Sequence, residues 1–191
     1  MASLDSFFDG EACREAMINI ISFEEVDSTN NVAAELIAGF TDVEDSLVLA
    51  GTQTAGRGRL NDRTWVSMPG NFHGTYIINV EKLGVSENSV ALLNRAAILA
   101  VRDEFLKLKK NDSGITIKLP NDILINKKKV AGVLIEVSHP FALIGIGINL
   151  SVSPMDFTTD IKKEFNVLVN SRELGQNLYI SLIKRIADER K

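Results

Sequence analysis

The chain has 191 residues, of which 45% are hydrophobic and 24% are charged, and its formal net charge is −4. This length suits one domain around a single core, and this composition excludes a disordered or fibrous protein. The negative net charge does not favour nucleic acid, and no apolar run approaches the roughly 20 residues that a membrane-spanning helix needs. We therefore expect neither nucleic acid nor a membrane as a partner.

The N-terminus and the cysteine content indicate a reducing compartment. Residues Met1–Gly10 lack the basic and apolar regions of a secretory signal and contain two aspartates. Cys13 is the only cysteine, so an internal disulfide is excluded, and no Cys/His group has the spacing of a zinc site. We expect a cytoplasmic protein, and the sequence identifies no metal ligand.

The first part of the chain predicts strands and helices in mixed order. Apolar runs predict strands at Ile18–Val26, Ser46–Thr52 and Phe72–Val80. Asp27–Asn30 offers oxygen acceptors that can cap a helix, which runs to Ala38 and is ended by Gly39. Gln53–Thr64 has too many glycines and polar residues to continue a strand, so it predicts a mobile loop. Ser86 is the expected cap of a long helix with apolar residues at three- and four-residue spacing.

The second part predicts an antiparallel meander followed by a helix. Four strands are expected at Ile115–Leu119, Asp122–Ile125, Val130–Val137 and Phe141–Leu150. Asn126–Lys129 and Ser138–Pro140 supply tight turns between them. Ser171 is the expected cap of a last helix with one apolar face. Together these elements predict an α+β fold, in which a mixed, largely antiparallel sheet carries helices mainly on one face.

The segment Gly56–Arg59 combines two glycines with two arginines. The glycines let the backbone curl, so the guanidinium groups of Arg57 and Arg59 could converge on an anion. Trp65, the only tryptophan, could stack on a purine. The alternatives are a solvated hairpin whose arginines serve solubility, and a buried tryptophan that closes the core.

Lys118 lies at the end of a predicted strand. The alternation of Ile115–Ile117 places the lysine on the face opposite the isoleucines, and Pro120 then stops strand pairing. The functional interpretation is a cation held for reaction. The alternative is an ordinary surface lysine before a turn.

Gly145–Asn149 places two glycines and Asn149 on one face of an apolar strand. A ligand or another backbone could approach closely there, and the asparagine could bond a base edge. The alternative is a β-bulge with a core asparagine that the backbone satisfies. No helix pattern follows, so this is not a dinucleotide-binding motif.

Several further residues have ordinary structural interpretations. Four polar residues are most often caps or loop residues, namely Ser28, Thr29, Asn30 and Gln53. His73 and His139 have no serine, cysteine or carboxylate at a telling spacing, so a catalytic triad has no support. Lys127–Lys129 predicts a solvated hairpin tip.

The joint order of these motifs resembles the catalytic domain of the biotin–protein ligases. The segments that carry the resemblance are Asp27–Asn30, Gln53–Arg59, Trp65–Asn71, Lys118–Asp122 with Lys129–Gly132, and Gly145–Asn149. The resemblance implies a class II synthetase-like fold that joins biotin to ATP with Mg²⁺ and releases pyrophosphate. It also implies transfer of the biotinyl group from biotinyl-5′-AMP to one lysine of a biotin carboxyl carrier domain of a carboxylase.

The resemblance also implies a role for each matching residue. Biotin would be bound by Ser28, Thr29, Asn30, Gln53, Gly56, Arg57, Gly58, Lys118 and Gly132. The nucleotide would be bound by Arg57, Arg59, Arg63, Trp65, Asn121 and Asn149. Lys118 and Arg59 would be catalytic, the first at the biotin carboxylate and α-phosphate and the second in a loop that closes over the adenylate.

The chain departs from the family pattern in two places. Leu60–Thr64 is one residue longer than in some relatives, with Arg63 as the equivalent of a later arginine, and Leu119 replaces the usual tryptophan. We expect one catalytic domain over residues 1–191, without the N-terminal helix-turn-helix of the repressor-type members and with the small C-terminal barrel absent or truncated. A monomer or weak homodimer is expected.

Two rival functions remain open from sequence. A lipoate–protein ligase or related acyltransferase would share the fold and a similarly placed lysine, although its loop would follow a different arginine and glycine pattern. A non-catalytic biotin- or nucleotide-binding module would share the binding residues and lack the reaction.

Overall fold

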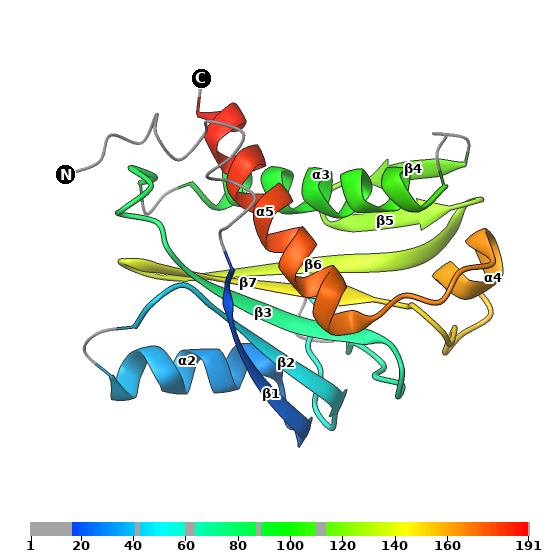
Figure 1. Ribbon diagram of the computed structural model, residues 1–191, viewed down its shortest axis with the longest axis horizontal. Coiled ribbons are helices and arrows are strands. Elements are labelled where there is room, and N and C mark those ends of the chain that lie inside the picture. Colours follow the sequence, from blue (N-terminus) through cyan, green and yellow to red (C-terminus); the bar gives the residue numbers. More distant parts are fainter. Residues whose placement is uncertain (1–16, 41–42, 60–63, 87–88, 110–113, 191) are drawn as a thin grey trace.

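The computed structural model describes residues 17–40, 43–59, 64–86, 89–109 and 114–190. Within these ranges one seven-stranded sheet has the order β1-β2-β3-β7-β6-β5-β4 (Figure 1). The strands are β1 (Asn19–Val26), β2 (Ser46–Gln53), β3 (Phe72–Asn79), β4 (Ile115–Lys118), β5 (Asp122–Ile125), β6 (Lys128–Ser138) and β7 (Phe141–Ile148). The helices are α2 (Thr29–Gly39), α3 (Val90–Lys109), α4 (Ile161–Phe165) and α5 (Ser171–Glu189).

The sheet is mixed and largely antiparallel, as the sequence predicts. Only β1 and β2 pair in parallel among the named strands, and the β4–β7 meander is antiparallel throughout. The β5–β6 turn consists of Asn126 and Lys127, whose φ angles of 49° and 67° are left-handed. Such angles belong to the two-residue hairpin turn that matches strand twist. Lys128 and Lys129 therefore belong to β6 and not to the turn.

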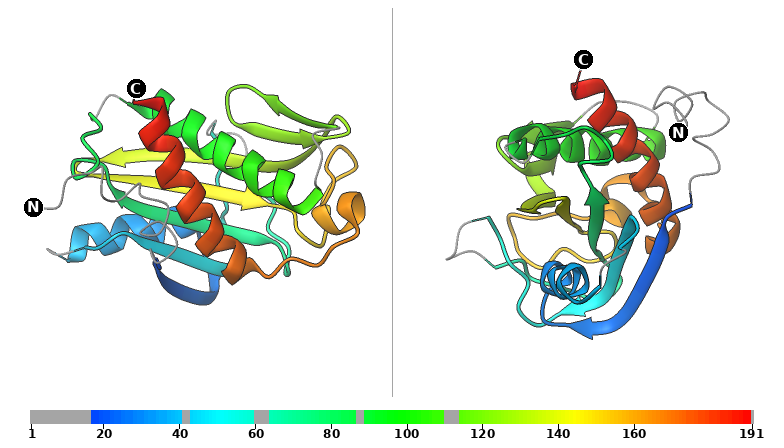
Figure 2. Two further views of the ribbon diagram at one scale, coloured as in Figure 1. Left: turned by 45° about the horizontal axis from the view of Figure 1, so that its top comes forward. Right: turned by 90° about the vertical axis from the view of Figure 1, so that its left-hand side faces the viewer.

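Helices cover both faces of the sheet, unequally. Tyr76 and Ile78 of β3 join the core under α3 and α5, whereas Ile77 joins a smaller cluster with Ala33 of α2. Successive residues of a strand point to opposite faces, so α2 lies opposite the two longest helices. The end-on view in Figure 2 shows this arrangement. The predicted fold class is confirmed, and α2 is the helix on the second face.

Two helix starts differ from the sequence predictions, and one helix was not predicted. The α3 helix begins directly after Ser89, whose carbonyl accepts from Leu93, and not directly after Ser86. The α5 helix is capped by Asn170, because its side chain accepts from two backbone N–H groups in the first turn, so Ser171 was the wrong cap. The short α4 helix was not predicted.

The α2 helix covers only part of its face of the sheet. Ala33 packs near Val48, Ile77 and Leu143. Toward the N-terminus of α2, the next paired positions of β3 and β7 on this face are Thr75 with Gly145 and His73 with Gly147. Small and polar residues cannot fill the space that the helix leaves. A hollow therefore forms beyond the start of α2.

Candidate functional site

The first residues of α2 form one wall of this hollow. Ser28, Thr29 and Asn30 are almost fully buried. Gln53, the last residue of β2, accepts hydrogen bonds from the Thr29 N–H at 2.8 Å and the Thr29 hydroxyl at 3.1 Å through Oε1. This satisfies one of the backbone donors that every helix start leaves free. The Ser28 side chain makes no capping bond and lines the hollow.

Asn30 is held on both sides of its amide. Its Oδ1 accepts from the Thr75 hydroxyl at 2.6 Å, and its Nδ2 donates to Glu136 Oε2 at 2.8 Å. A Cβ on Gly145 would lie 2.4 Å from Asn30 Oδ1, so only glycine leaves room for this amide. The close approach expected at the glycines of β7 is thus made by a polar side chain of α2.

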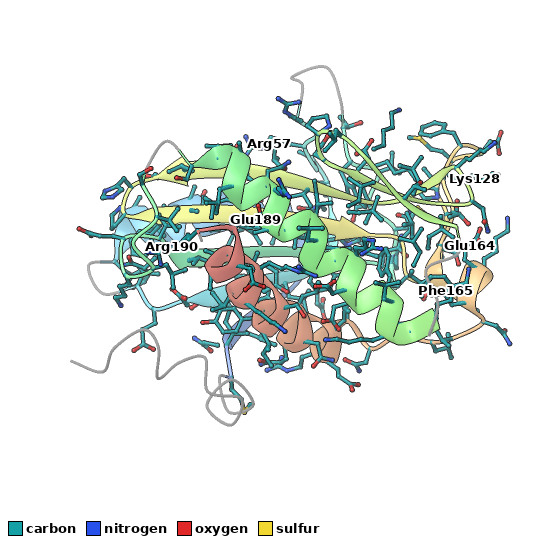
Figure 3. The ribbon with its side chains drawn as sticks, turned by 90° about the horizontal axis from the view of Figure 1, so that it is seen from above. Arg57, Lys128, Glu164, Phe165, Glu189 and Arg190 are labelled. Carbon is teal, nitrogen blue, oxygen red and sulfur yellow. The ribbon has the colours of Figure 1, made fainter. Side chains whose placement is uncertain are left out.

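The segment Gly56–Arg59, here called the arginine loop, closes over the hollow from one side. The backbone N–H of Trp65 donates to the backbone oxygen of Gly56 at 2.9 Å, and Arg57 forms a β-bridge with Thr64. Arg57 Nη2 lies 3.0 Å from Glu136 Oε2. In the view of Figure 3, the labelled Arg57 side chain lies far from α4. Arg59 is exposed and has no ion pair with a described residue. Arg63 lies outside the described ranges.

Trp65 lies across the glycine floor of the hollow. A Cβ on Gly147 would lie 2.5–2.9 Å from its ring atoms, and one on Gly132 would lie 3.5 Å away. Lys129 Nζ is 5.6 Å from the ring centroid, within cation–π range. The indole Nε1 is buried and has no hydrogen-bond partner among the described residues. The tryptophan therefore belongs to the site, and its buried donor is free for a ligand.

Two cavities meet at this point. The smaller, of about 60 Å³, is lined by residues predicted to bind biotin, namely Ser28, Thr29, Asn30, Gln53, Arg57, Gly58 and Gly132. The larger, of about 720 Å³, includes Lys118 and Asn149 in its lining. Five residues line both and form the junction: Gly58, Arg59, Trp65, Asn121 and Lys129. Gly56 lines neither, because it is packed against Trp65.

Lys118 and Lys129 differ in where they reach. Lys118 is exposed and lies on the face opposite Ile115 and Ile117, as predicted, but it lines only the larger cavity. Lys129 lies at the junction, where its Nζ is 2.7 Å from Asp122 Oδ1. Its prediction as a solvated hairpin tip was wrong, because the turn is shorter than expected. Lys128, in contrast, lies at the α4 end of the molecule (Figure 3).

The two predicted nucleotide-binding asparagines already donate within the chain. Asn149 is buried, and its Nδ2 donates to Thr159 O at 3.1 Å. Asn121 Nδ2 donates to Val133 O at 2.9 Å. Both line the larger cavity, where their amide groups also order the wall. Leu119, which replaces the family tryptophan, is 80% exposed and therefore does not support Lys118 by packing.

A serine–histidine pair adjoins Gln53 and was missed from sequence. Ser67 Oγ accepts from the Gln53 N–H at 2.8 Å and lies 3.1 Å from His73 Nε2. Burial lowers the pKa of His73, which favours the neutral imidazole, and a neutral imidazole can accept a hydrogen bond from the serine hydroxyl. Ser67, in contact with His73, thus satisfies the backbone N–H of Gln53, a residue that lines the smaller cavity.

The described residues contain no group of three or more His, Cys, Asp or Glu side chains that could hold a metal ion. Among the same residues, no helix is both long enough and apolar enough to cross a membrane.

Comparison with known proteins agrees with the site. The pattern of the biotin/lipoate A/B protein ligase family matches residues 22–152. The chain belongs to this family. The chain is 38% identical over 133 residues to the biotin–[acetyl-CoA-carboxylase] ligase of Paracoccus denitrificans. The matched region covers 67% of this chain and 53% of that protein. The chain spans about half the length of the curated relatives that it matches.

Two solved structures of the family share the fold. The biotin protein ligase from Leishmania major in complex with biotinyl-5-AMP is 30% identical, with a TM-score of 0.77 over 89% of this chain and 75% of that one. The biotin protein ligase from Aquifex aeolicus in complex with biotin and ATP is 28% identical, with a TM-score of 0.69 over 90% of this chain and 69% of that one. The fold and the family expected from the motifs are confirmed.

Proposed function

We propose that the chain is the catalytic part of a biotin–protein ligase. It would join biotin and ATP into biotinyl-5′-AMP, release pyrophosphate, and pass the biotinyl group to one lysine of a biotin carboxyl carrier domain. The observation that carries this proposal is the pair of cavities that meet at a cationic junction of Arg59 and Lys129. The two solved relatives bind biotinyl-5-AMP in one case and biotin with ATP in the other, which supports one cavity for biotin and one for the nucleotide.

The smaller cavity suits the polar head of biotin. Hydroxyl and amide groups of Ser28, Thr29 and Asn30 converge above a glycine floor, so they can exchange hydrogen bonds with a ureido ring. Its volume of about 60 Å³ is well below that of a typical ligand pocket, roughly 300–1,000 Å³. We therefore propose that Trp65 moves off Gly147 when biotin enters.

The larger cavity suits the nucleotide. Its volume of about 720 Å³ is that of an ordinary ligand pocket. Its lining includes cationic side chains that can neutralise phosphates and apolar side chains that can contact a base. The cationic residues are Arg59, Lys118, Lys127 and Lys129, and the apolar ones are Val66, Pro154, Met155 and Phe157.

The cationic junction addresses the main barrier of the first step. A carboxylate oxygen of biotin attacks the α-phosphorus of ATP, a new P–O bond forms, and the bond to pyrophosphate breaks. Both reactants are anions, so their approach costs Coulomb energy that Lys129 and Arg59 can offset. Lys118, which lines the larger cavity, would hold the phosphates there. No enzyme nucleophile is needed.

The second step needs a free amine and no water. The neutral amine of the acceptor lysine attacks the carbonyl of the mixed anhydride, an amide bond forms, and AMP leaves. The arginine loop lies between the smaller cavity and solvent, so it can shield this reactive intermediate from hydrolysis.

The donor set fits a magnesium ion that arrives with the nucleotide. Asp122 is the carboxylate that lines the larger cavity among the described residues, and magnesium is commonly bound by one or two carboxylates together with substrate phosphates. When bound, the ion would neutralise phosphate charge. Lys129 Nζ pairs with Oδ1 of the same carboxylate and would hold its orientation.

The acceptor and the cellular setting are part of the same proposal. A carrier-domain lysine is the acceptor that the name of the Paracoccus relative supports. We further propose that the protein acts as a monomer or weak homodimer, and that it acts in the cytoplasm.

Calorimetric titration and pyrophosphate release test this function together. We expect biotin to bind, lipoate to give no comparable signal, and pyrophosphate to appear only with biotin and MgATP. Tight lipoate binding without a biotin signal would replace the proposal with lipoate ligation. Biotin binding without pyrophosphate release would indicate a non-catalytic binding module.

A further inference from the structure

We propose that Glu136 is a positioning residue that anchors the arginine loop over the smaller cavity and sets the amide of Asn30. Its effect on substrates rests on the proposed function, whereas its effect on the loop does not.

One carboxylate oxygen joins two separate walls of the cavity. Glu136 Oε2 accepts from Arg57 Nη2 at 3.0 Å and from Asn30 Nδ2 at 2.8 Å. Arg57 belongs to the arginine loop and Asn30 to the first turn of α2. The carboxylate thus ties the loop and the helix start to β6, a central strand.

Glu136 borders an apolar cluster, so packing alone does not explain a carboxylate at this position. It is paired on β6 with Leu143 of β7, which packs under α2 in the apolar cluster. A carboxylate at the edge of that cluster would repel anionic substrates unless a nearby cation neutralised its charge. Arg57 supplies that cation, with about two-fifths of each side chain still exposed to water.

The two arginines of the loop therefore have different tasks. Arg57 is already paired and serves as the anchor, whereas Arg59 has no ion pair with a described residue and lines both cavities. Of the two arginines in the loop, Arg59 is therefore the one whose charge is available to an anionic substrate.

Hydrogen exchange in the substrate-free protein tests the anchor directly. We expect Glu136→Ala and Arg57→Ala each to raise the amide exchange of the arginine loop about two- to five-fold, the range for a partly exposed ion pair. The double variant should match the single variants, because both remove the same contact. Glu136→Gln keeps the side-chain size and should give a smaller rise. The control is Glu25→Ala, which removes a carboxylate on β1 that contacts Thr52 and lies outside the cavities.

Two results would refute the anchoring role of Glu136. One is a double variant whose rise in exchange is the product of the two single rises, and the other is unchanged loop exchange in both single variants and the double variant. Thermal unfolding is measured on each variant, and Glu136→Gln replaces Glu136→Ala in the cycle if the latter fails to fold.

Biotin affinity tests the second half of the inference. Loss of Glu136 frees Asn30 as well as Arg57, so Glu136→Ala should weaken biotin several-fold more than Arg57→Ala. Equal losses would refute the link to Asn30. If the wild-type chain bound no biotin, the proposed function would fail while the exchange result still decided the anchor.

Discussion

Replacing Gly145 with alanine perturbs the site at one defined point. The new Cβ would lie 2.4 Å from Asn30 Oδ1 and 3.2 Å from the backbone oxygen of Leu134. Ordinary contact begins near 3.4 Å, so the asparagine amide must withdraw by about 1 Å. That movement takes Asn30 out of reach of the Thr75 hydroxyl, now at 2.6 Å, and strains its bond to Glu136.

The cost follows from these two hydrogen bonds. Each contributes about 1 kcal/mol net, so Gly145→Ala should lower the free energy of unfolding by about 2 kcal/mol. For a chain of this size that corresponds to a fall in Tm of about 4–8 °C. Biotin affinity should fall roughly tenfold, since losing one well-placed hydrogen bond costs about 1.4 kcal/mol.

Calorimetry measures both quantities, and the chain offers a matched control. Gly39 ends α2 and has nothing within 4 Å of a Cβ, so Gly39→Ala should leave Tm unchanged or slightly higher. A Gly145→Ala protein with the Tm and biotin affinity of the wild type would refute the account of how Asn30 is held.

Three further results are expected. Lys129→Ala should lower biotin-dependent pyrophosphate release by roughly 10²–10³-fold, and Lys118→Ala should lower it less, because only Lys129 lies at the junction. Saturating biotin should change the fluorescence of Trp65, the only tryptophan, as it leaves Gly147 and its buried Nε1 gains a partner. The Tm should fall as pH drops below about 6.5, because burial lowers the pKa of His73 and the unfolded chain then binds the proton more readily. Comparison of the wild type with His73→Gln between pH 8 and pH 5.5 isolates this contribution.

Each expectation has a contrary outcome. A greater loss in Lys118→Ala than in Lys129→Ala would return the reacting centre to the larger cavity. An unchanged tryptophan spectrum at saturating biotin would show that the indole already stands in its ligand-bound position. Parallel pH profiles for the wild type and His73→Gln would show that this imidazole does not couple to folding.

Local pattern was enough for the strands and for much of the cavity lining. The alternation of β7 placed Gly145 and Gly147 on one face, and the structure puts both against side chains of the site. The family motifs named the residues at the start of α2, which are buried around the smaller cavity.

The missed residues depend on contacts between distant segments. Glu136 looks like an ordinary polar residue in an apolar strand, and its partners lie 79 and 106 residues away. Lys129 was assigned to a turn because the sequence does not reveal that Asn126 and Lys127, both with left-handed φ angles, complete the β5–β6 turn alone. The α4 helix has five residues, too few to show a helical period.

Transfer of labelled biotin to a carrier-domain lysine tests the central claim most directly. The chain, MgATP, labelled biotin and a purified biotin carboxyl carrier domain are combined, and the label on the carrier is measured with and without its acceptor lysine. We expect label only on the carrier that keeps this lysine, and only when ATP is present. An unlabelled carrier, or label that appears without ATP or on the carrier that lacks its acceptor lysine, would contradict the assignment.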